Sequence, residues 1–319
     1  MGELRFHAAT LDDAAFAADV WTAARPSAPV DPVVKRYWWA TPSETYVSER
    51  YVVTRGGERI GFALVDHVRW DGPGPRYVSL RGDLLPEVRT AARLDELLAG
   101  LEVKGRATGA TVLRTKAVED DPLRESVVRG RGYREDRRSR RWELDLVGNR
   151  ARILALAEES RERMRRAGIE LCTLAAIAEP SKYEQVWRVG DEAARDIPTT
   201  EPHPDESLED YLQWLRSPDT REDRFWVARR EGRIVGLSVL SYPPVRGIVN
   251  TSYTATARSV RGLGVARATK GETLVQAIGL GVDRVRTGND AQNAPILHIN
   301  AAMGYRPIAG AIEFMKDLS

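Results

Sequence analysis

The sequence predicts an α/β (α+β) protein made of two similar domains in tandem. Its 319 residues exceed the length of one typical domain and suffice for two, each with a core of its own. In both halves the apolar patterns follow the order strand, helix, hairpin, strand, helix. Short landmarks recur at a constant spacing of 172 residues: Arg89 and Arg261, Thr115 and Thr287, Gly132 and Gly304, Leu146 and Leu318. This common register indicates an internal duplication.

The first half supplies the elements of one copy. Residues 4–8 alternate like a strand, and a capping-box-like Thr-Leu-Asp-Asp sequence opens an apolar helix that runs to Trp21. Residues 51–65 are two apolar runs around a Gly-Gly turn, which is the pattern of a β-hairpin. A strand at 77–80 and a helix at 86–98 complete the copy. Residues 1–147 are therefore predicted to form the first domain.

Between the copies, residues 149–167 form a charged helical pattern without strand alternation, and Gly168 ends it. We assign residues 148–168 to a linker helix and residues 169–319 to the second domain. That domain is expected to begin with a strand containing Cys172, which has no neighbouring histidine to activate it and is interpreted as a core residue.

Two further segments of the second domain have clear local signals. A Ser-x-x-Glu capping box at Ser181 and Glu184 is expected to start its first helix. Residues 225–236 repeat the hairpin of the first copy, with Gly232 standing 175 residues after Gly57. Small insertions explain the departure from the common spacing.

Composition narrows the class of protein and its partners. Hydrophobic residues make up 42% of the chain and charged residues 29%, as in soluble globular proteins, and no apolar run approaches the ~18 residues of a membrane span. The first six residues lack the order of a secretory signal, and one cysteine cannot form an internal disulfide, so we expect a cytoplasmic monomer or homodimer.

The charge is almost balanced. The 48 basic and 46 acidic residues give a net charge of +2, which creates no global attraction for nucleic acid or membranes. The most basic stretch, residues 129–141, is interrupted by Glu135 and Asp136. A solvated hairpin explains it more simply than a phosphate-binding patch.

The segment 258–270 lies between an alternating strand pattern at 249–257 and a helix pattern that reaches about residue 280. Gly262 and Gly264 let the backbone approach a ligand, and the free N–H groups of a helix start favour an anion such as pyrophosphate. The spacing is not that of a Walker loop or of the dinucleotide fingerprint. A glycine-containing helix start without any ligand is the alternative.

The sequence Arg261-Gly-Leu-Gly-Val-Ala266 resembles the Arg/Gln-x-x-Gly-x-Gly/Ala signature of the GNAT superfamily of acyl-CoA-dependent N-acyltransferases. Residues 285–305 are similar to the region that follows it in that family, with a strand, an Asn-rich turn, a short helix and a Gly-aromatic pair. The resemblance implies two GNAT-like domains, each with a mixed central sheet flanked by helices, and acetyl-CoA as co-substrate without a metal.

The resemblance also implies which residues bind the coenzyme. The loop would hold the pyrophosphate, Asn293 the pantetheine arm, and the strand before the loop the acetyl group beside a bulge. The expected coenzyme-binding residues are Ala255, Thr256, Arg261, Gly262, Leu263, Gly264, Val265, Ala266, Asn289, Asn293 and Asn300.

The catalytic groups are harder to assign. Family members often carry a glutamate base on the strand before the loop, whereas this strand offers Tyr253 and hydroxyl residues but no carboxylate. Glu201, in a proline-rich loop at 196–204, or a chain of water molecules is the candidate base. Asp196, Glu201 and Asp205 are candidates to hold a cationic amine. Asn300 stands where the family usually has a tyrosine that acts as the general acid. Because asparagine cannot supply a proton, either Asn300 orients the leaving thiolate or the thiolate leaves unprotonated.

The first copy has lost the loop. Opposite the loop residues stand Thr90, Ala91, Ala92, Arg93 and Leu94. With both glycines gone, methyl groups would block a phosphate, so we expect one acetyl-CoA per chain. The predicted function is direct transfer of an acetyl group to a primary amine acceptor. A non-catalytic acyl-CoA-binding module and a mycothiol-synthase-like activity are the alternatives.

Overall fold

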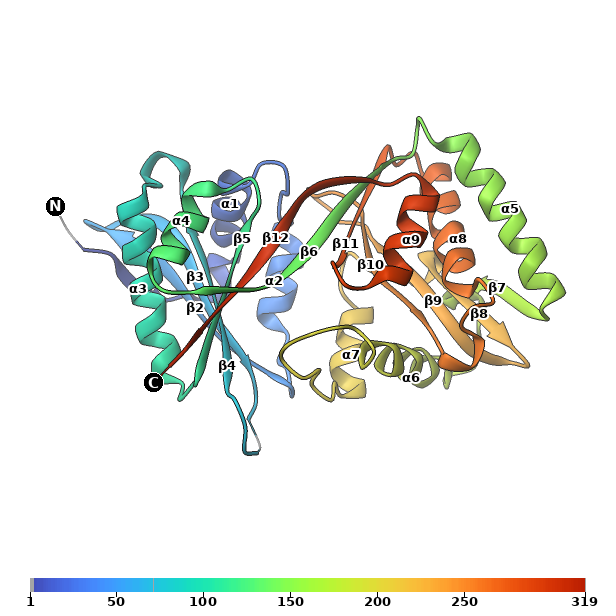
Figure 1. Cartoon of the computed structure of the whole chain (residues 1–319), viewed down its shortest axis with the longest axis horizontal. Coiled ribbons are helices and arrows are strands. Elements are labelled where there is room, and N and C mark those ends of the chain that lie inside the picture. The colour runs from blue at the N-terminus through green and yellow to red at the C-terminus, as the bar shows by residue number, and fades with distance from the viewer. Residues whose placement is uncertain (1–2, 71, 319) are drawn as a thin grey trace. The chain divides into compact units, whose positions relative to one another are not determined.

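The computed structural model describes residues 3–70 and 72–318, which form two compact units (Figure 1). The first unit contains the chain up to Ser139, Pro244–Gly247 and the residues from Ala309 onward. The second contains Arg140–Pro243 and Ile248–Ile308. Both combine a mixed sheet with helices, so the predicted fold class is confirmed.

The first unit has a sheet in the order β1-β2-β3-β4-β5-β12, in which β4 and β5 are parallel and the other neighbours with a described register are antiparallel. Its elements are β1 (Arg5–Ala8), α1 (Ala14–Ala24), α2 (Pro32–Ala40), β2 (Tyr46–Arg55), β3 (Glu58–Val68), β4 (Tyr77–Leu84), α3 (Ala91–Ala107), β5 (Val112–Val118), α4 (Pro122–Gly130), the first part of β6 (Arg134–Asp145) and most of β12 (Arg306–Asp317).

Alternation along the strands builds two cores in this unit. Phe62 on β3 packs against α1, whereas its neighbour Ala63 packs in the cluster that contains the leucines of α3. Successive strand residues point to opposite faces, so one strand contributes to both cores. The predicted hairpin turns at Gly56 and Gly57, whose φ angles are 59° and 90°, as a tight two-residue turn requires.

The second unit has a sheet in the order β6-β11-β10-β9-β8-β7, in which β10 and β11 are parallel. Its elements are the second part of β6, α5 (Arg150–Arg166), β7 (Ile169–Thr173), α6 (Lys182–Ala194), α7 (Leu208–Leu215), β8 (Phe225–Arg230), β9 (Arg233–Ser241), β10 (Asn250–Thr256), α8 (Val265–Gly279), β11 (Arg284–Asp290), α9 (Ala294–Met303) and the start of β12.

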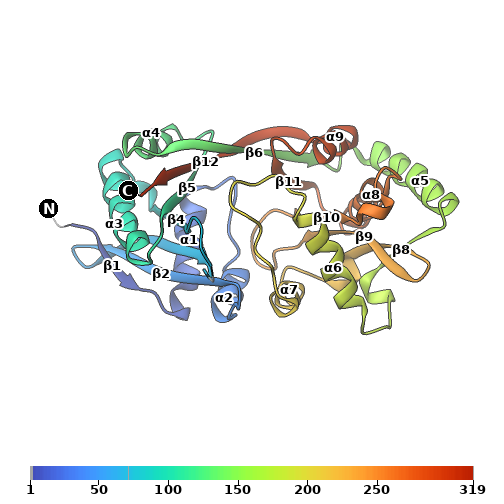
Figure 2. The same ribbon diagram turned by 60° about the horizontal axis from the view of Figure 1, so that its bottom comes forward.

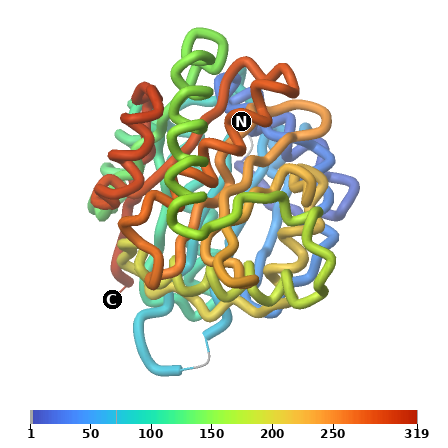
Figure 3. The backbone as a smooth tube through the Cα atoms, turned by 90° about the vertical axis from the view of Figure 1, so that its right-hand side faces the viewer, coloured from blue at the N-terminus to red at the C-terminus, as the bar shows by residue number. Residues whose placement is uncertain are grey.

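Helices cover both faces of this second sheet (Figure 2). Val227 packs with α6 and α7, and the adjacent Ala228 packs with the start of α8 and the end of α5. The helix α5 lies beside α8 (Figure 3), where Arg161 forms two hydrogen bonds of 2.7 and 2.9 Å to Glu272. The helix predicted as a linker is therefore part of the second unit.

The last strand of each copy enters the other unit. β6 and β12 occupy equivalent positions in the duplication, since their bounds differ by the common spacing of 172 residues. The end of β12 pairs with β5, from Ala311 opposite Val118 to Asp317 opposite Val112. The compact units therefore differ from the sequence ranges 1–147 and 169–319 at the end of each copy.

Two local predictions were wrong. The basic stretch 129–141 is the end of α4 followed by a single strand, not a hairpin. Its charges are paired, for example Arg129 with Glu125 and Glu135. Ser181 precedes α6 but makes no side-chain cap, because its backbone is already helical (φ −63°, ψ −11°) and its hydroxyl accepts from the Gln185 side chain at 3.3 Å. The Glu184 carboxylate pairs with Arg188.

Cys172 is half-buried in β7 beside the second core, and burial raises the pKa of its thiol. This agrees with a packing role. Within the described part of the chain, no helix is both long and apolar enough to span a membrane.

Candidate functional site

The parallel strands β10 and β11 pair only where they begin. Asn250 lies opposite Arg286, and the Arg286 N–H donates to the Val249 carbonyl at 2.9 Å. Among the described residues, no ladder pair joins the rest of the two strands. The β11-facing edge of β10 therefore offers unpaired backbone groups to an extended ligand.

A register shift in β10 lies between Thr251 and Tyr253, so Ser252 is the extra residue of a bulge. The bulge precedes Ala255 and Thr256, which pair regularly with Leu237 and Gly236 of β9. Placement of an acetyl group beside these two residues stays a prediction.

The loop after β10 has the backbone conformation that its glycines permit. Gly262 and Gly264 have φ angles of 77° and 92°, which other residues adopt only with strain, and α8 begins directly after Gly264. The N–H groups of Gly262, Gly264, Val265 and Ala266 have no intramolecular acceptor in the described chain. Aligned free donors at a helix N-terminus form an anion site.

Arginines surround this loop. Arg258 and Arg261 both bind Asp196, with closest distances of 2.6 Å for each, and the two guanidinium groups hold the pKa of Asp196 well below its usual range. Asp196 is thus occupied by arginines, which contradicts its predicted role in holding an amine. Asp205 is likewise paired, with Arg195 at 2.9 Å.

Arg163 contacts this loop but is not among the coenzyme-binding residues predicted from the sequence. It comes from α5, donates to the Gly262 carbonyl at 3.2 Å, and lies 3.3 Å from the place where a Cβ on Gly264 would stand. The sequence predicts this segment as a linker, for which no coenzyme contact is expected. The basic spacing within α5 contains no signal that would have singled out this one.

Three polar residues form a buried chain behind the end of β11. The Lys270 Nζ donates to Asn300 Oδ1 at 2.8 Å, and Asn300 Nδ2 donates to Asn289 Oδ1 at 2.8 Å. Both Lys270 and Asn300 have 0% of their surface exposed. Asn300 is therefore shielded from solvent and committed to Lys270 and Asn289, which argues against its predicted direct contacts with the coenzyme and the thiolate.

Asn293 stands at the start of α9 without capping it, since its side chain makes no cap hydrogen bond. It is half-buried, and its amide has no intramolecular partner in the described chain. An uncommitted amide at a helix start is compatible with its predicted contact to a ligand.

Tyr253 of β10 faces α6, where its hydroxyl donates to the Gly190 carbonyl at 2.7 Å. Burial raises the pKa of Tyr253, and the nearby charges of Glu206 and Asp191 raise it further. Glu201 is partly exposed in the loop between α6 and α7, and it is not among the groups that act on Tyr253. Glu206, not Glu201, is therefore the glutamate whose charge acts on Tyr253.

Glu206 has the environment of a functional carboxylate. Burial raises its pKa, Asp210 and Asp191 raise it further, and His203 opposes them. Within the described residues, its carboxylate has neither a hydrogen bond nor an ion pair. The buried Tyr211 hydroxyl also lacks a partner in the described chain, and Glu206 is one of the charges that raise its pKa. The acidic residues that the sequence predicts at the acceptor site end with Asp205, and Glu206 directly follows it.

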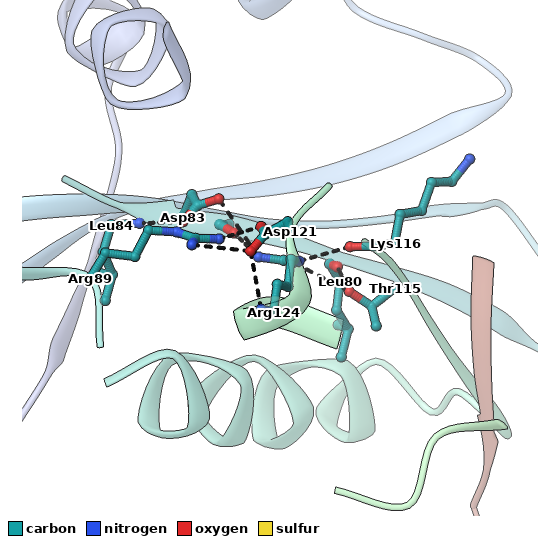
Figure 4. A network of polar contacts seen from close by, with 9 residues as sticks. Leu80, Asp83, Leu84, Arg89, Thr115, Lys116, Asp121 and Arg124 are labelled. Atoms are coloured by element: carbon teal, nitrogen blue, oxygen red, sulfur yellow. Dashed lines mark hydrogen bonds and ion pairs between the residues drawn. The ribbon is translucent and has the colours of Figure 1, made fainter. Parts of the chain in front are cut away.

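The first unit has a different network at the equivalent positions (Figure 4). Asp83, Arg89 and Asp121 occupy the register positions of Ala255, Arg261 and Asn293. Arg89 Nε donates to Asp83 at 2.7 Å, and its two terminal nitrogens donate to Asp121 at 3.2 and 2.5 Å. Asp83 also accepts the Leu84 N–H at 3.0 Å. Internal carboxylates thus take the donors that an acyl-CoA would need.

At the start of α3, the equivalent helix of this copy, a side chain of the protein accepts one of the backbone N–H groups. The Thr90 hydroxyl accepts the Arg93 N–H at 3.4 Å, so α3 is capped by its own chain. Arg124, which is 7% exposed, donates to the Gly82 carbonyl at 2.7 Å. These contacts support the prediction of one coenzyme site per chain.

Comparison with known proteins agrees with this geometry. Residues 187–305 match the family model described as Acetyltransferase (GNAT) family. No curated protein is similar enough in sequence to count as a match.

Solved structures match nearly the whole chain. A tandem GNAT protein from the clavulanic acid biosynthesis pathway has a TM-score of 0.75 at 18% identity, covering 99% of this chain and 98% of its own. A GCN5-related N-acetyltransferase from Sphaerobacter thermophilus has a TM-score of 0.64 at 18% identity, with coverages of 98% and 95%. A GNAT-family acetyltransferase from Colwellia psychrerythraea has 0.61 at 11% identity, with coverages of 98% and 99%.

The family match supports acyltransferase activity, and the structural matches show the fold. The chain therefore carries a domain of the GNAT acetyltransferase family in its C-terminal half and has, over nearly its whole length, the fold of tandem GNAT proteins.

Proposed function

We propose that this protein transfers an acetyl group from acetyl-CoA directly to a primary amine, and that the second unit performs the reaction. The observation that carries the proposal is the unpaired, partly buried carboxylate of Glu206, whose charge acts on Tyr253 of β10. The coenzyme loop follows the same strand. A base on one side of a strand and an anion site at its end are the two requirements of acyl transfer from a thioester to an amine.

The donor side depends on backbone groups. The diphosphate would lie on the free N–H groups at Gly262–Ala266, with Arg163 nearby as a positive charge. The pantetheine arm would pair with the unpaired edge of β10 and reach Asn293. A β10 backbone N–H would then stabilise the oxyanion that develops on the thioester.

The acceptor side depends on Glu206. An amine arriving as an ammonium ion would find the carboxylates of Glu206, Asp191 and Asp210 close together, although Asp191 is already shared with Arg195. Because burial raises the pKa of Glu206, this carboxylate is a stronger base than an exposed one. It would take one proton from the ammonium ion, and the neutral amine so formed would attack the thioester carbon. The second nitrogen proton would pass to solvent once the C–N bond has formed, and the C–S bond would then break. The leaving thiolate would receive a proton from solvent.

Tyr253 has a supporting role in this scheme. Its hydroxyl proton is committed to the Gly190 carbonyl, and its raised pKa opposes loss of that proton. Tyr253 would therefore shape the acceptor site and would not protonate the thiolate.

The test is release of free CoA thiol from acetyl-CoA in a screen of amine classes, including the acceptor of mycothiol synthase. Glu206→Gln should lower kcat by roughly 10²- to 10⁴-fold, the usual contribution of a general base, with little change in acetyl-CoA affinity. Glu209→Gln is the matched control, because Glu209 is exposed and paired with Arg216 at 3.1 Å. Full activity of Glu206→Gln would remove Glu206 from the mechanism.

The second candidate is a non-catalytic acyl-CoA-binding module. It is favoured by Asn300, which is fully buried and leaves no side chain able to donate a proton in the usual place of the general acid. Such a module would gain thermal stability with acetyl-CoA but release no thiol with any amine. The same screen therefore separates the two functions.

A further inference from the structure

A lysine lies completely buried inside the second unit, at one end of the hydrogen-bond chain that reaches Asn289 on β11. Lys270 of α8 has 0% of its surface exposed, and its Nζ is 4.8 Å from the centre of the Tyr305 ring. Its side chain donates one hydrogen bond, to Asn300 Oδ1. Lysines are almost never buried without a partner, so this position has a specific use.

The hydrogen bond from Lys270 fixes the orientation of the Asn300 side-chain amide, which in turn fixes that of Asn289. An ammonium group only donates, so Asn300 must turn its oxygen toward Lys270. The Asn300 NH₂ group then faces Asn289 and donates to its oxygen at 2.8 Å. The NH₂ group of Asn289 is left at the end of the chain, without an intramolecular acceptor in the described residues. This chain of hydrogen bonds therefore ends in an N–H donor, the NH₂ group of Asn289.

The free end lies where β10 and β11 are no longer paired. Asn289 is the next-to-last residue of β11, three positions beyond Arg286, the last residue with a partner on β10. It is partly buried, while the alternate residues Val285 and Thr287 on the same face are buried. The pantetheine arm, which carries amide carbonyls, would pass along this opening.

We propose that Lys270 is a positioning residue for the coenzyme: acting through Asn300, it turns the Asn289 NH₂ group toward a carbonyl oxygen of the pantetheine arm or thioester. This inference rests on the proposed function. The buried amine touches no ligand itself. Lys270 enforces this orientation as an ammonium ion, which cannot accept a hydrogen bond. Burial lowers its pKa to about 7, and only the neutral amine formed above that pH could accept from Asn300.

The test compares acetyl-CoA with adenosine 3′,5′-bisphosphate, which lacks the pantetheine arm, by titration calorimetry. Lys270→Met keeps the size of the side chain but removes the donor, and Asn300 is then free to reverse its amide. We expect the Kd for acetyl-CoA to rise about five- to tenfold, the effect of one lost hydrogen bond, while the Kd for the bisphosphate stays unchanged. Thr269→Val, a buried change in the same helix, is the control and should alter neither.

A double-mutant cycle shows whether Lys270 acts through Asn289. Asn289→Ala should produce the same selective loss, and Lys270→Met should add nothing in that background. Lys270→Gln, which retains an N–H donor, should restore acetyl-CoA binding and also serves if the methionine variant does not fold.

Each outcome decides a different point. Equal weakening of both ligands, or additive losses in the cycle, would show that Lys270 only supports the structure. Wild-type acetyl-CoA affinity in the Lys270→Met protein would also overturn the inference. If the wild-type protein binds neither ligand, the proposed function itself fails.

Discussion

The carboxylate network of the first unit predicts a large loss of stability when one charge is removed. Asp83 is 4% exposed and binds Arg89 at 2.7 Å, and the buried guanidinium of Arg124 lies 3.9 Å away. Asp83→Asn preserves the shape and the acceptor for the Leu84 N–H but removes the negative charge. Two arginines would then share Asp121 as their remaining carboxylate in this network.

The magnitude follows from burial. Breaking a buried ion pair costs about 3–5 kcal/mol, because the other charge stays buried without compensation. We expect about 3 kcal/mol, at the lower end, because Arg89 keeps its contacts with Asp121 and its side chain is 14% exposed. The control is Asp12→Asn, where the side chain is 92% exposed and its pair with Arg36 contributes little.

Urea unfolding followed by circular dichroism measures the effect. If the chain unfolds in two transitions, the loss should fall on the transition of the first unit and leave the second in place. A loss below about 0.5 kcal/mol for Asp83→Asn would refute the reasoning, because a charge change in a buried network cannot be that small if the network is closed to solvent.

Four further outcomes are expected. Gly264→Glu should abolish acetyl-CoA binding in calorimetry, because its carboxylate repels the diphosphate; the φ of 92° should also cost about 1–3 kcal/mol of stability, which a thermal melt would show. Asn293→Ala should weaken acetyl-CoA by about 1 kcal/mol, and unchanged affinity would remove it from the site. The wild-type stoichiometry should be near one, and a value near two would mean that the first copy also binds. Although burial opposes the charge of Asp121, hydrogen bonds from Arg89 and the Arg124 N–H lower its pKa below the ordinary 3.8. The stability that Asp121 gives the first unit should therefore be fully present well above pH 4 and be lost as the pH falls through the pKa of Asp121 in the folded protein. An acid titration of unfolding that shows no such decline would contradict this.

The sequence predicted the parts of the fold that depend on local pattern. The landmarks such as Gly132 and Gly304 have equivalent places because the two copies repeat their strands and helices, and Gly264 has the positive φ that its position before a helix suggested. Periodicity did not predict which unit the last strand of each copy joins, since an exchanged strand has the same pattern of side chains as one that stays.

The site was predictable only in its backbone part. Pairing of Asp196 with Arg258 and Arg261 depends on contacts across more than 60 residues, and nothing local distinguishes it from a free carboxylate. Lys270 lies in an ordinary helical sequence, so its burial is visible only once α8 is packed on the sheet. Glu206 differs from Glu201 in its surroundings, not in its sequence context.

The pairing of β12 with β5 has a consequence for synthesis of the chain. The first unit cannot complete its sheet when its own segment leaves the ribosome, because Val118 finds its partner Ala311 only about 190 residues later. At a translation rate of ~5–20 residues per second, the edge of β5 waits for ~10–40 s. During that time it exposes unpaired N–H and C=O groups next to apolar residues such as Leu113. The nascent first unit should therefore need protection from association until residues 311–317 emerge, and this segment controls when the sheet of the first unit becomes complete.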